Sequence, residues 1–393
     1  MVWRAALRRW ATGAVSNVVA ASLSAIVLGV MVAGVLVVGA VGWSESAEAA
    51  TPRRWGPQRC GGGARLRGGA PPDKYARWCV REVDGDFLRH GPYRSWYDNG
   101  RKQVFGSYVR GEKHGRWFEW YDDGTPKRQE HWRSGKRDGL RVRWYANGKE
   151  RDRGRFLAGK QHGAVEIRHD NGLPAERLSF IHGQPQGELK AWHSNGTIQR
   201  QGNFVRGLQH GMWREWHRSG KVKVEGAYDA GKETGLYSAW RPDGSREWTG
   251  TYLQGQKHGE FQTWYPGGKR ESRSVYRFGR RQGVWRTWHA NGQLAQQSTY
   301  RDDVLDGEQA AWRETGARVR VTRWRGGKKN GEQSLWFDGG RPKTNATYRD
   351  GTLHGRFLVW EESGGFSAGS CYVTGKVTWS TTSEPTARMR ACP

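Results

Sequence analysis

The sequence predicts an all-β protein: an elongated single-layer antiparallel sheet of twelve 24-residue β-hairpin repeats, preceded by one N-terminal hydrophobic helix. Three observations predict this fold. A glycine recurs every 24 residues without insertion or deletion, aromatic residues recur in fixed phase with it, and the chain is poor in apolar residues. Only 35% of the 393 residues are hydrophobic, whereas 57 are Gly and 23 are Trp. This composition favours a thin structure in which rings pack on neighbouring rings.

The glycine that opens each unit defines the repeat. Five positions later a Trp stands in eleven of the twelve units, with Arg168 as the exception. Every unit also has a second Gly nine positions after the first and an aromatic residue seventeen positions after it. The opening glycines are Gly91, Gly115, Gly139, Gly163, Gly187, Gly211, Gly235, Gly259, Gly283, Gly307, Gly331 and Gly355.

Within a unit the pattern indicates two short strands and two turns. Residues 210–217 and 221–228 carry the strand-forming residues of one unit. Asn-Gly and Asp-Gly pairs at the first turn, such as Asn99-Gly100, accept the positive φ angles of tight hairpins. A small residue precedes the second-strand aromatic by two positions in ten of the twelve units, and it therefore shares that aromatic's face. We expect a Trp ring of the paired strand to lie over the backbone there.

The organisation of the chain follows from this repeat. The hairpin repeats are expected over residues 91–378. Because each unit contacts mainly its neighbours, both ends of the array need caps. Residues 51–90 form a Gly/Pro/Arg-rich linker and N-terminal cap, and residues 379–393 form a C-terminal cap or tail.

Residues 1–50 have the pattern of a signal peptide or an N-terminal membrane anchor. Arg4, Arg8 and Arg9 precede an uncharged run whose most apolar part, residues 18–41, is long enough to cross a hydrocarbon core of ~30 Å. Residues 47–49 resemble a cleavage site. With either reading, the remainder is extracytoplasmic: in the cell envelope, anchored in the inner membrane, or released into the periplasm after cleavage.

Four cysteines lie beyond this segment, two on each side of the repeats. An even number in an exported chain indicates disulfides, and three pairings are formally open. The pairing that we favour joins neighbours in sequence, Cys60 with Cys79 and Cys371 with Cys392. The absence of CxxC spacing argues against a metal site.

The formal net charge is +27, and residues 1–50 hold only three Arg and two Glu, so nearly all of it belongs to the rest of the chain. The charge either favours an anionic partner or only keeps the surface soluble. Basic residues gather in the turns. At one edge they are Lys113, Lys136, Arg137, Lys160, Arg280, Arg281, Lys328 and Lys329. At the other edge they are Arg101, Lys149, Lys221, Lys269 and Arg341.

The recurring Trp residues predict an aromatic ladder, as a structural or binding face. Its members are Trp96, Trp120, Trp144, Trp192, Trp216, Trp240, Trp264, Trp288, Trp312, Trp336 and Trp360. The predicted partner is a protein or an anionic envelope surface, either lipid headgroups or acidic glycan. Basic and aromatic residues also alternate in nucleic-acid platforms, but export argues against such a ligand.

No catalytic residue, cofactor or metal site is predicted, because the sequence has no nucleophile elbow, phosphate-binding loop or HExxH motif. Histidine precedes the opening glycine in six units. These residues are His90, His114, His162, His210, His258 and His354. Equivalent positions in successive hairpins lie about 10 Å apart, too far to share one zinc ion, so we interpret them as turn residues.

The consensus Gly-x-Trp-x-x-Trp-[Tyr/His]-x-[Asn/Ser]-Gly-Lys, followed by Gly-x-[Tyr/Phe]-x-x-Gly-x-x-His-Gly, resembles the MORN repeat in its bacterial variant, whose members include YwqK-type antitoxin-like proteins. Residues 211–235 and 259–283 show it most clearly. Arg168-His169, Asp303 and Gln309 depart from the pattern. The resemblance implies a hairpin array without catalytic activity, associated with membrane attachment, lipid headgroups and protein scaffolding.

Three functions remain open at this point. The first is a non-catalytic exported repeat scaffold that binds a protein partner or an anionic envelope component. The second is an immunity (antitoxin) protein against an envelope-acting toxin. The third is an enzyme acting on cell-wall glycan.

Overall fold

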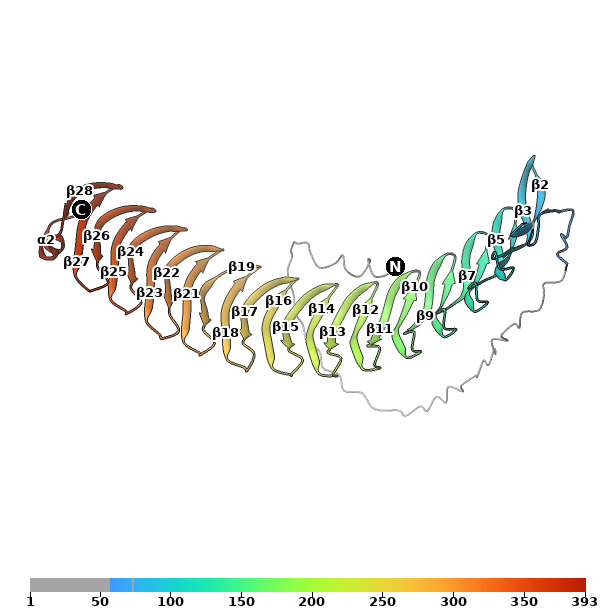
Figure 1. The fold of residues 1–393 in the computed structure, drawn as a ribbon, viewed down its shortest axis with the longest axis horizontal. Helices are drawn as coiled ribbons and strands as arrows, with labels where there is room; N and C mark the ends of the chain where they lie inside the picture. Colours follow the sequence, from blue (N-terminus) through green and yellow to red (C-terminus); the bar gives the residue numbers. More distant parts are fainter. Residues whose placement is uncertain (1–56, 73) are drawn as a thin grey trace, which may run out of the picture. The chain divides into compact units, whose positions relative to one another are not determined.

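The computed structural model describes residues 57–72 and 74–393, and this part of the chain is all-β. Twenty-eight strands form one sheet, with a single short helix, α2, near the C-terminus. The chain divides into two units, Met1–Gln58 and Arg59–Pro393, and every strand among the described residues belongs to the second. Figure 1 shows the strands following one another in chain order. The predicted all-β sheet of hairpins is confirmed.

The first half of the sheet contains β1 (Arg65–Gly68), β2 (Ala76–Val83), β3 (Asp86–Trp96), β4 (Lys102–Val109), β5 (Glu112–Trp120), β6 (Pro126–Arg133), β7 (Lys136–Trp144), β8 (Glu150–Leu157), β9 (Lys160–Arg168), β10 (Pro174–Ile181), β11 (Gln184–Trp192), β12 (Ile198–Val205), β13 (Leu208–Trp216) and β14 (Val222–Asp229). The second half contains β15 (Lys232–Trp240), β16 (Arg246–Leu253), β17 (Gln256–Trp264), β18 (Arg270–Arg277), β19 (Arg280–Arg281), β20 (Gly283–Trp288), β21 (Leu294–Arg301), β22 (Val304–Trp312), β23 (Arg318–Arg325), β24 (Lys328–Trp336), β25 (Pro342–Arg349), β26 (Thr352–Trp360), β27 (Phe366–Val373) and β28 (Lys376–Thr381), followed by α2 (Glu384–Met389).

Consecutive strands pair antiparallel, as in β13 with β14 and β14 with β15. The hydrophobic segment expected at residues 18–41 lies outside the described residues. Within residues 57–72 and 74–393, no helix combines the length and apolarity that a membrane crossing requires. The predicted cap segments both contain sheet strands: β1 and β2 lie in residues 51–90, and part of β28 together with α2 lies in residues 379–393.

Two kinds of turn alternate along the sheet. The turn that enters the next unit has two residues, such as Ala230 and Gly231, whose φ angles of 45° and 80° define a type I′ turn. Asp303 takes the place of the usual glycine with a φ of 71°, and its carboxylate accepts the backbone N–H of Arg281 at 2.9 Å. The other turn follows each Trp and spans four residues, for example 217–220.

The opening glycine is required by a bulge in the strand. Gly211 has a φ of 71°, a conformation that side chains with a Cβ rarely adopt. Between the pairs Asn203–His210 and Gln201–Arg214, only Gly202 lies opposite the three residues 211–213. The bulge therefore explains why this position recurs as glycine throughout the array.

An aromatic ring lies over the backbone of the preceding strand, as expected. A Cβ added to Gly226 would lie 2.3 Å from Tyr237 Cδ1, and one added to Gly202 would lie 2.1 Å from Trp213 Cδ2. The rings of Trp213 and Tyr237 are only 6% and 5% exposed. The covering residue stands two positions after the opening glycine, so it is not one of the Trp residues of the predicted ladder.

These rings join the second-strand aromatics in one continuous series. Consecutive centroids lie 5.0–6.0 Å apart, mostly edge to face, a geometry that stabilises aromatic pairs. We call this series the ring file, and the side of the sheet that carries it the ring face. The ring file consists of Phe204, Trp213, Tyr228, Tyr237, Tyr252, Phe261, Tyr276, Trp285 and Tyr300.

Other side chains continue this core where rings are missing. On the N-terminal side, Val165, Leu178 and Leu189 form an aliphatic cluster with Phe180 and Trp213. Closer to the N-terminus, Asp152 is 1% exposed and pairs with Arg141 at 3.1 Å. Arg143 donates to the same carboxylate at 2.8 Å, so two guanidinium groups compensate the buried charge of Asp152.

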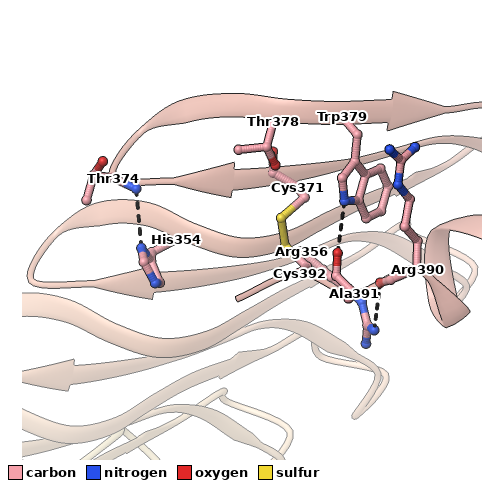
Figure 2. Close-up of a disulfide and its surroundings, with 9 residues drawn as sticks. All are labelled: His354, Arg356, Cys371, Thr374, Thr378, Trp379, Arg390, Ala391 and Cys392. Atoms are coloured by element: carbon pink, nitrogen blue, oxygen red, sulfur yellow. Dashed lines mark hydrogen bonds between the residues drawn. A yellow bond between two sulfur atoms is a disulfide. The ribbon is translucent and has the colours of Figure 1, made fainter.

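Disulfides close both ends of the second unit, and the favoured pairing is confirmed. Cys60 bonds to Cys79, and Cys371 bonds to Cys392. Figure 2 shows the second bridge, beside which the Trp379 indole N–H donates to the Ala391 carbonyl at 3.1 Å. The fully buried Ala387 of α2 packs where a Cβ on Gly369 would stand. The tail therefore caps β27 and β28.

The packing of Tyr237 over Gly226 predicts the effect of Gly226→Ala. The added methyl group must displace the ring, so the β14–β15 region should lose about 1–3 kcal/mol. Amide hydrogen exchange in β14 and β15 measures this loss locally. Gly154→Ala is the matched control. The nearest atom to its added Cβ would be Val165 Cγ2 at 3.0 Å, a looser contact than at Gly226, so the loss should be smaller. Equal protection in Gly226→Ala and the parent protein would contradict the packing argument.

The Cys371–Cys392 bridge predicts a local effect of its removal. Replacing both cysteines by serine should destabilise the C-terminal cap by about 3 kcal/mol in the chain-entropy account of a loop of this length. Amides of α2 and β28 should then exchange faster, while those of β11–β13 keep their protection, since the units contact mainly their neighbours. Unchanged exchange in α2 would show that packing alone holds the cap.

Candidate functional site: the two turn margins of the sheet

The eleven Trp residues of the predicted ladder form a row on the side opposite the ring face. Each is half-buried and is the last residue of its strand. Because side chains alternate along a strand, Trp117 points to the ring face while Phe118 and Trp120 point to the other side. The rings of Phe118 and Trp120 stack there at 6.0 Å. We call this side the Trp face.

Cations from the preceding hairpin lie over several rings of the Trp row. The Arg246 guanidinium is 5.3 Å from the Trp264 ring centroid, and Arg270 is 5.5 Å from Trp288. Cation–π contacts of this kind stabilise the packing of neighbouring units. The Trp row therefore contributes to the stacking of hairpins, in addition to its exposed area.

At the margin that carries the four-residue turns, polar side chains bind the next unit. In several units the residue after the Trp reaches the backbone carbonyl of the next Trp: Tyr121 Oη donates to the Trp144 carbonyl at 3.0 Å, and His217 Nε2 bonds to the Trp240 carbonyl at 2.8 Å. A carbonyl only accepts, so His217 carries its proton on Nε2. We call this edge the Trp margin.

The predicted basic residues of the Trp margin have the same structural role. Lys149 Nζ donates to the backbone carbonyl of Asn171 at 2.8 Å, and Lys221 Nζ donates to the backbone carbonyl of Asp243 at 2.6 Å. Arg101, Lys269 and Arg341 make equivalent bonds with the following turn. These five cations satisfy turn carbonyls, and their positions are explained by the fold.

The predicted basic residues at the other edge, the tight-turn margin, separate into two groups. Four lie on the ring face over aromatic rings, at ring-centroid distances of 4.3 Å for Lys113 with Trp117, 5.0 Å for Arg137 with Trp132, 4.2 Å for Arg281 with Tyr300 and 4.6 Å for Lys329 with Tyr348. Burial, and next the nearby Arg128, lowers the pKa of Lys113. These four side chains cover the ends of the aromatic core.

The other group points to the Trp face and is exposed. Its members are Lys136, Lys160, Arg280 and Lys328. Further exposed cations, which the sequence analysis did not single out, occupy the same edge of the Trp face. They are Arg133, Lys232, Arg277, Arg301, Arg325 and Arg349. Strand alternation provides the signal that separates the two groups, because neighbours such as Lys136 and Arg137 must face opposite sides.

A shallow hollow opens beside these cations. Arg301, Arg323 and Arg325 line it together with Asp306 and Glu308. Asp306 pairs with Arg301 at 3.0 Å, so its charge is already matched. The hollow extends the basic surface of the tight-turn margin towards the centre of the Trp face.

Three of the six histidines before the opening glycines, namely His90, His258 and His354, bond to the backbone of the tight turns. Nδ1 of His90 accepts the backbone N–H of Arg110 at 3.4 Å, and His354 accepts that of Thr374 at 3.2 Å (Figure 2). Gln186 and Gln282 accept the same bond through their amide oxygens. Within the described part of the chain, no group of three or more His, Cys, Asp or Glu residues has the arrangement of a metal site.

A protein-family model matches part of the repeat region. The model of the MORN repeat variant matches residues 113–133, 185–206, 209–230, 257–277 and 281–302. Each match begins two residues before an opening glycine, so the family model finds the MORN repeat variant in five repeats of the same phase. The antitoxin-like assignment stays a prediction.

A search of curated proteins finds no match to this chain. One similar solved structure is described as "Crystal Structure of TcdB2-TccC3 without hypervariable C-terminal region". The match has 10% sequence identity and a TM-score of 0.13, and it covers 75% of this chain and 22% of that chain. This chain therefore spans about a fifth of that structure's chain, and the similarity is too low to bear on fold or function.

His90 predicts a pH dependence of stability. Burial, and next Arg81 and Arg110, lowers the pKa of His90 from 6.5. The unfolded chain therefore binds the proton first, and the stability that His90 contributes is complete above pH 6.5 and declines as the pH falls below it.

Denaturation midpoints across this range should fall less steeply for His90→Gln than for the parent protein. Glutamine cannot titrate, and Gln186 and Gln282 show that its amide oxygen accepts the same backbone bond. Identical pH profiles for the two proteins would contradict the role given to His90.

Proposed function

We propose that this protein is an exported, non-catalytic scaffold of twelve MORN-variant hairpins that binds an anionic component of the cell envelope through its tight-turn margin. The observation that carries the proposal is the distribution of cations. Those of the Trp margin bind turn carbonyls and those of the ring face cover aromatic rings, whereas those of the Trp face at the tight turns are exposed. Exposed cations raise the local concentration of anionic ligands.

The number of repeats and the location rest on separate observations. Five matches in one phase, together with the unbroken glycine spacing, support twelve units. Two disulfides support an oxidising compartment, and the charge pattern of residues 1–50 supports export. The aromatic side chains of the ring file and the polar side chains of the Trp margin hold one hairpin against the next. This structural role supports a scaffold without catalysis.

The proposal predicts salt-sensitive attachment to the cell envelope. Residues 59–393, which contain all of the described strands and both disulfides, should sediment with envelope fragments at about 0.1 M salt, where the Debye length is about 10 Å. They should be released at about 1 M salt, where the Debye length is about 3 Å. Fragments stripped of protein by protease should bind equally well. Loss of binding after proteolysis would assign the surface to a protein partner, and salt-insensitive binding would exclude the electrostatic mechanism.

Immunity against an envelope-acting toxin and activity on cell-wall glycan remain predictions from the sequence, and no contact described above favours either. A toxin gene adjacent to the gene of this protein would favour immunity. Hydrolysis of purified envelope glycan would favour an enzyme.

A further inference from the structure

The exposed cations of the tight-turn margin are concentrated towards the C-terminal end of the sheet. Arg277, Arg301, Arg325 and Arg349 occupy one equivalent position, the last residue of β18, β21, β23 and β25. All four are exposed. The equivalent strand ends nearer the N-terminus hold Val, Leu or Ile, except for Arg133 and Asp229. We call the four residues the arginine row.

The arginine row carries a surplus of positive charge. Among the residues that the structure describes, Arg277, Arg325 and Arg349 have no acidic group within salt-bridge distance, and Arg301 has only Asp306. The turns between them contain Asp302, Asp303 and Asp350. Of these carboxylates, that of Asp303 is bound by Arg281 at 3.1 Å, and that of Asp350 accepts the Asn330 amide at 3.2 Å.

Two of the four arginines face a like charge across the sheet. Arg277 lies directly opposite Arg280 in the strand register, and Arg325 lies opposite Lys328. Like charges directly opposite each other destabilise an antiparallel pair. An anion bound between them would remove this repulsion. The cations of the row therefore differ from Lys149 or Arg137, whose contacts stabilise the fold.

The spacing of the row limits the shape of the ligand. Equivalent positions in successive hairpins are two strands apart, about 10 Å. The row is a single file, so it matches a linear polymer whose charges recur at that distance. An extended β-linked disaccharide has a comparable length. A lipid surface would favour cations at the equivalent strand ends over the whole margin, whereas those nearer the N-terminus expose Leu157, Ile181 and Val205.

We propose that the arginine row binds an extended acidic polysaccharide with one negative charge per disaccharide, which lies along the tight-turn margin from β18 to β25. This inference rests on the proposed function and specifies its ligand. Each guanidinium pairs with one carboxylate, a planar geometry that arginine forms better than lysine. The hollow beside Arg301 and Arg325, which Arg323, Asp306 and Glu308 also line, lies next to the path of the polymer.

The test uses the full chain in neutral detergent and hyaluronan oligosaccharides as the probe, because they carry one carboxylate per disaccharide. The test variant replaces the row by Arg277→Gln, Arg301→Gln, Arg325→Gln and Arg349→Gln. The matched control replaces four exposed cations of the same margin nearer the N-terminus, by Arg133→Gln, Lys136→Gln, Lys160→Gln and Lys232→Gln. Thermal unfolding confirms that both variants remain folded.

The row variant should bind hyaluronan about tenfold more weakly than the parent, because four exposed ion pairs of modest strength are lost together. The control variant should stay within about twofold. Affinity should rise with oligosaccharide length until the chain is about as long as the row, then level off. Methyl-esterified hyaluronan, which has the same length without charge, should not bind.

Three outcomes would overturn the inference: equal losses in both variants, equal binding of the methyl ester, or row-dependent binding to phosphatidylglycerol vesicles without binding to hyaluronan. The last would assign the row to lipid headgroups. If hyaluronan fails while residues 59–393 still bind envelope fragments in a salt-sensitive way, only the polysaccharide is excluded. If both bindings fail, the proposed function fails as well.

Discussion

The packing of an aromatic ring on the bare backbone of the preceding strand is the interaction on which the rest of this sheet depends. A single-layer sheet has no second layer to bury its apolar side chains, so burial must come from neighbours within the layer. Gly202 and Gly226 allow Trp213 and Tyr237 to lie flat against the main chain, where they are 6% and 5% exposed. The next unit then supplies the same contact, and the ring file results.

This mode of burial determines where polar groups can act. The four-residue turns bring Tyr, His and Lys side chains against carbonyls of the next unit, as Tyr121 and Lys149 show. Beside the tight turns, cations such as Lys113 and Arg281 cover aromatic rings of the ring face. The tight-turn positions of the Trp face have no such role, so their side chains are available for a ligand.

The sequence predicted the structure well at positions where a single physical requirement determines the residue type. Glycine spacing located the strands and turns, and cysteine positions located both disulfides. It was less informative about faces. The Trp residues of the expected ladder lie opposite the ring file, because the covering ring stands two rather than five positions after the opening glycine. The expected basic edge combined Lys136 with Arg137, which strand alternation places on opposite faces.

Some positions of the repeat are fixed by the fold, whereas others are free to vary and can serve binding. The opening glycine adopts a positive φ in a bulge, so its identity is fixed by the backbone in every unit. The last residue of the second strand has no packing requirement on the Trp face, and it varies among Val205, Asp229 and Arg277 within the same array. In a repeat protein whose units contact mainly their neighbours, such a position can change without disturbing the stack. Four successive arginines there are therefore better explained by a ligand than by stability.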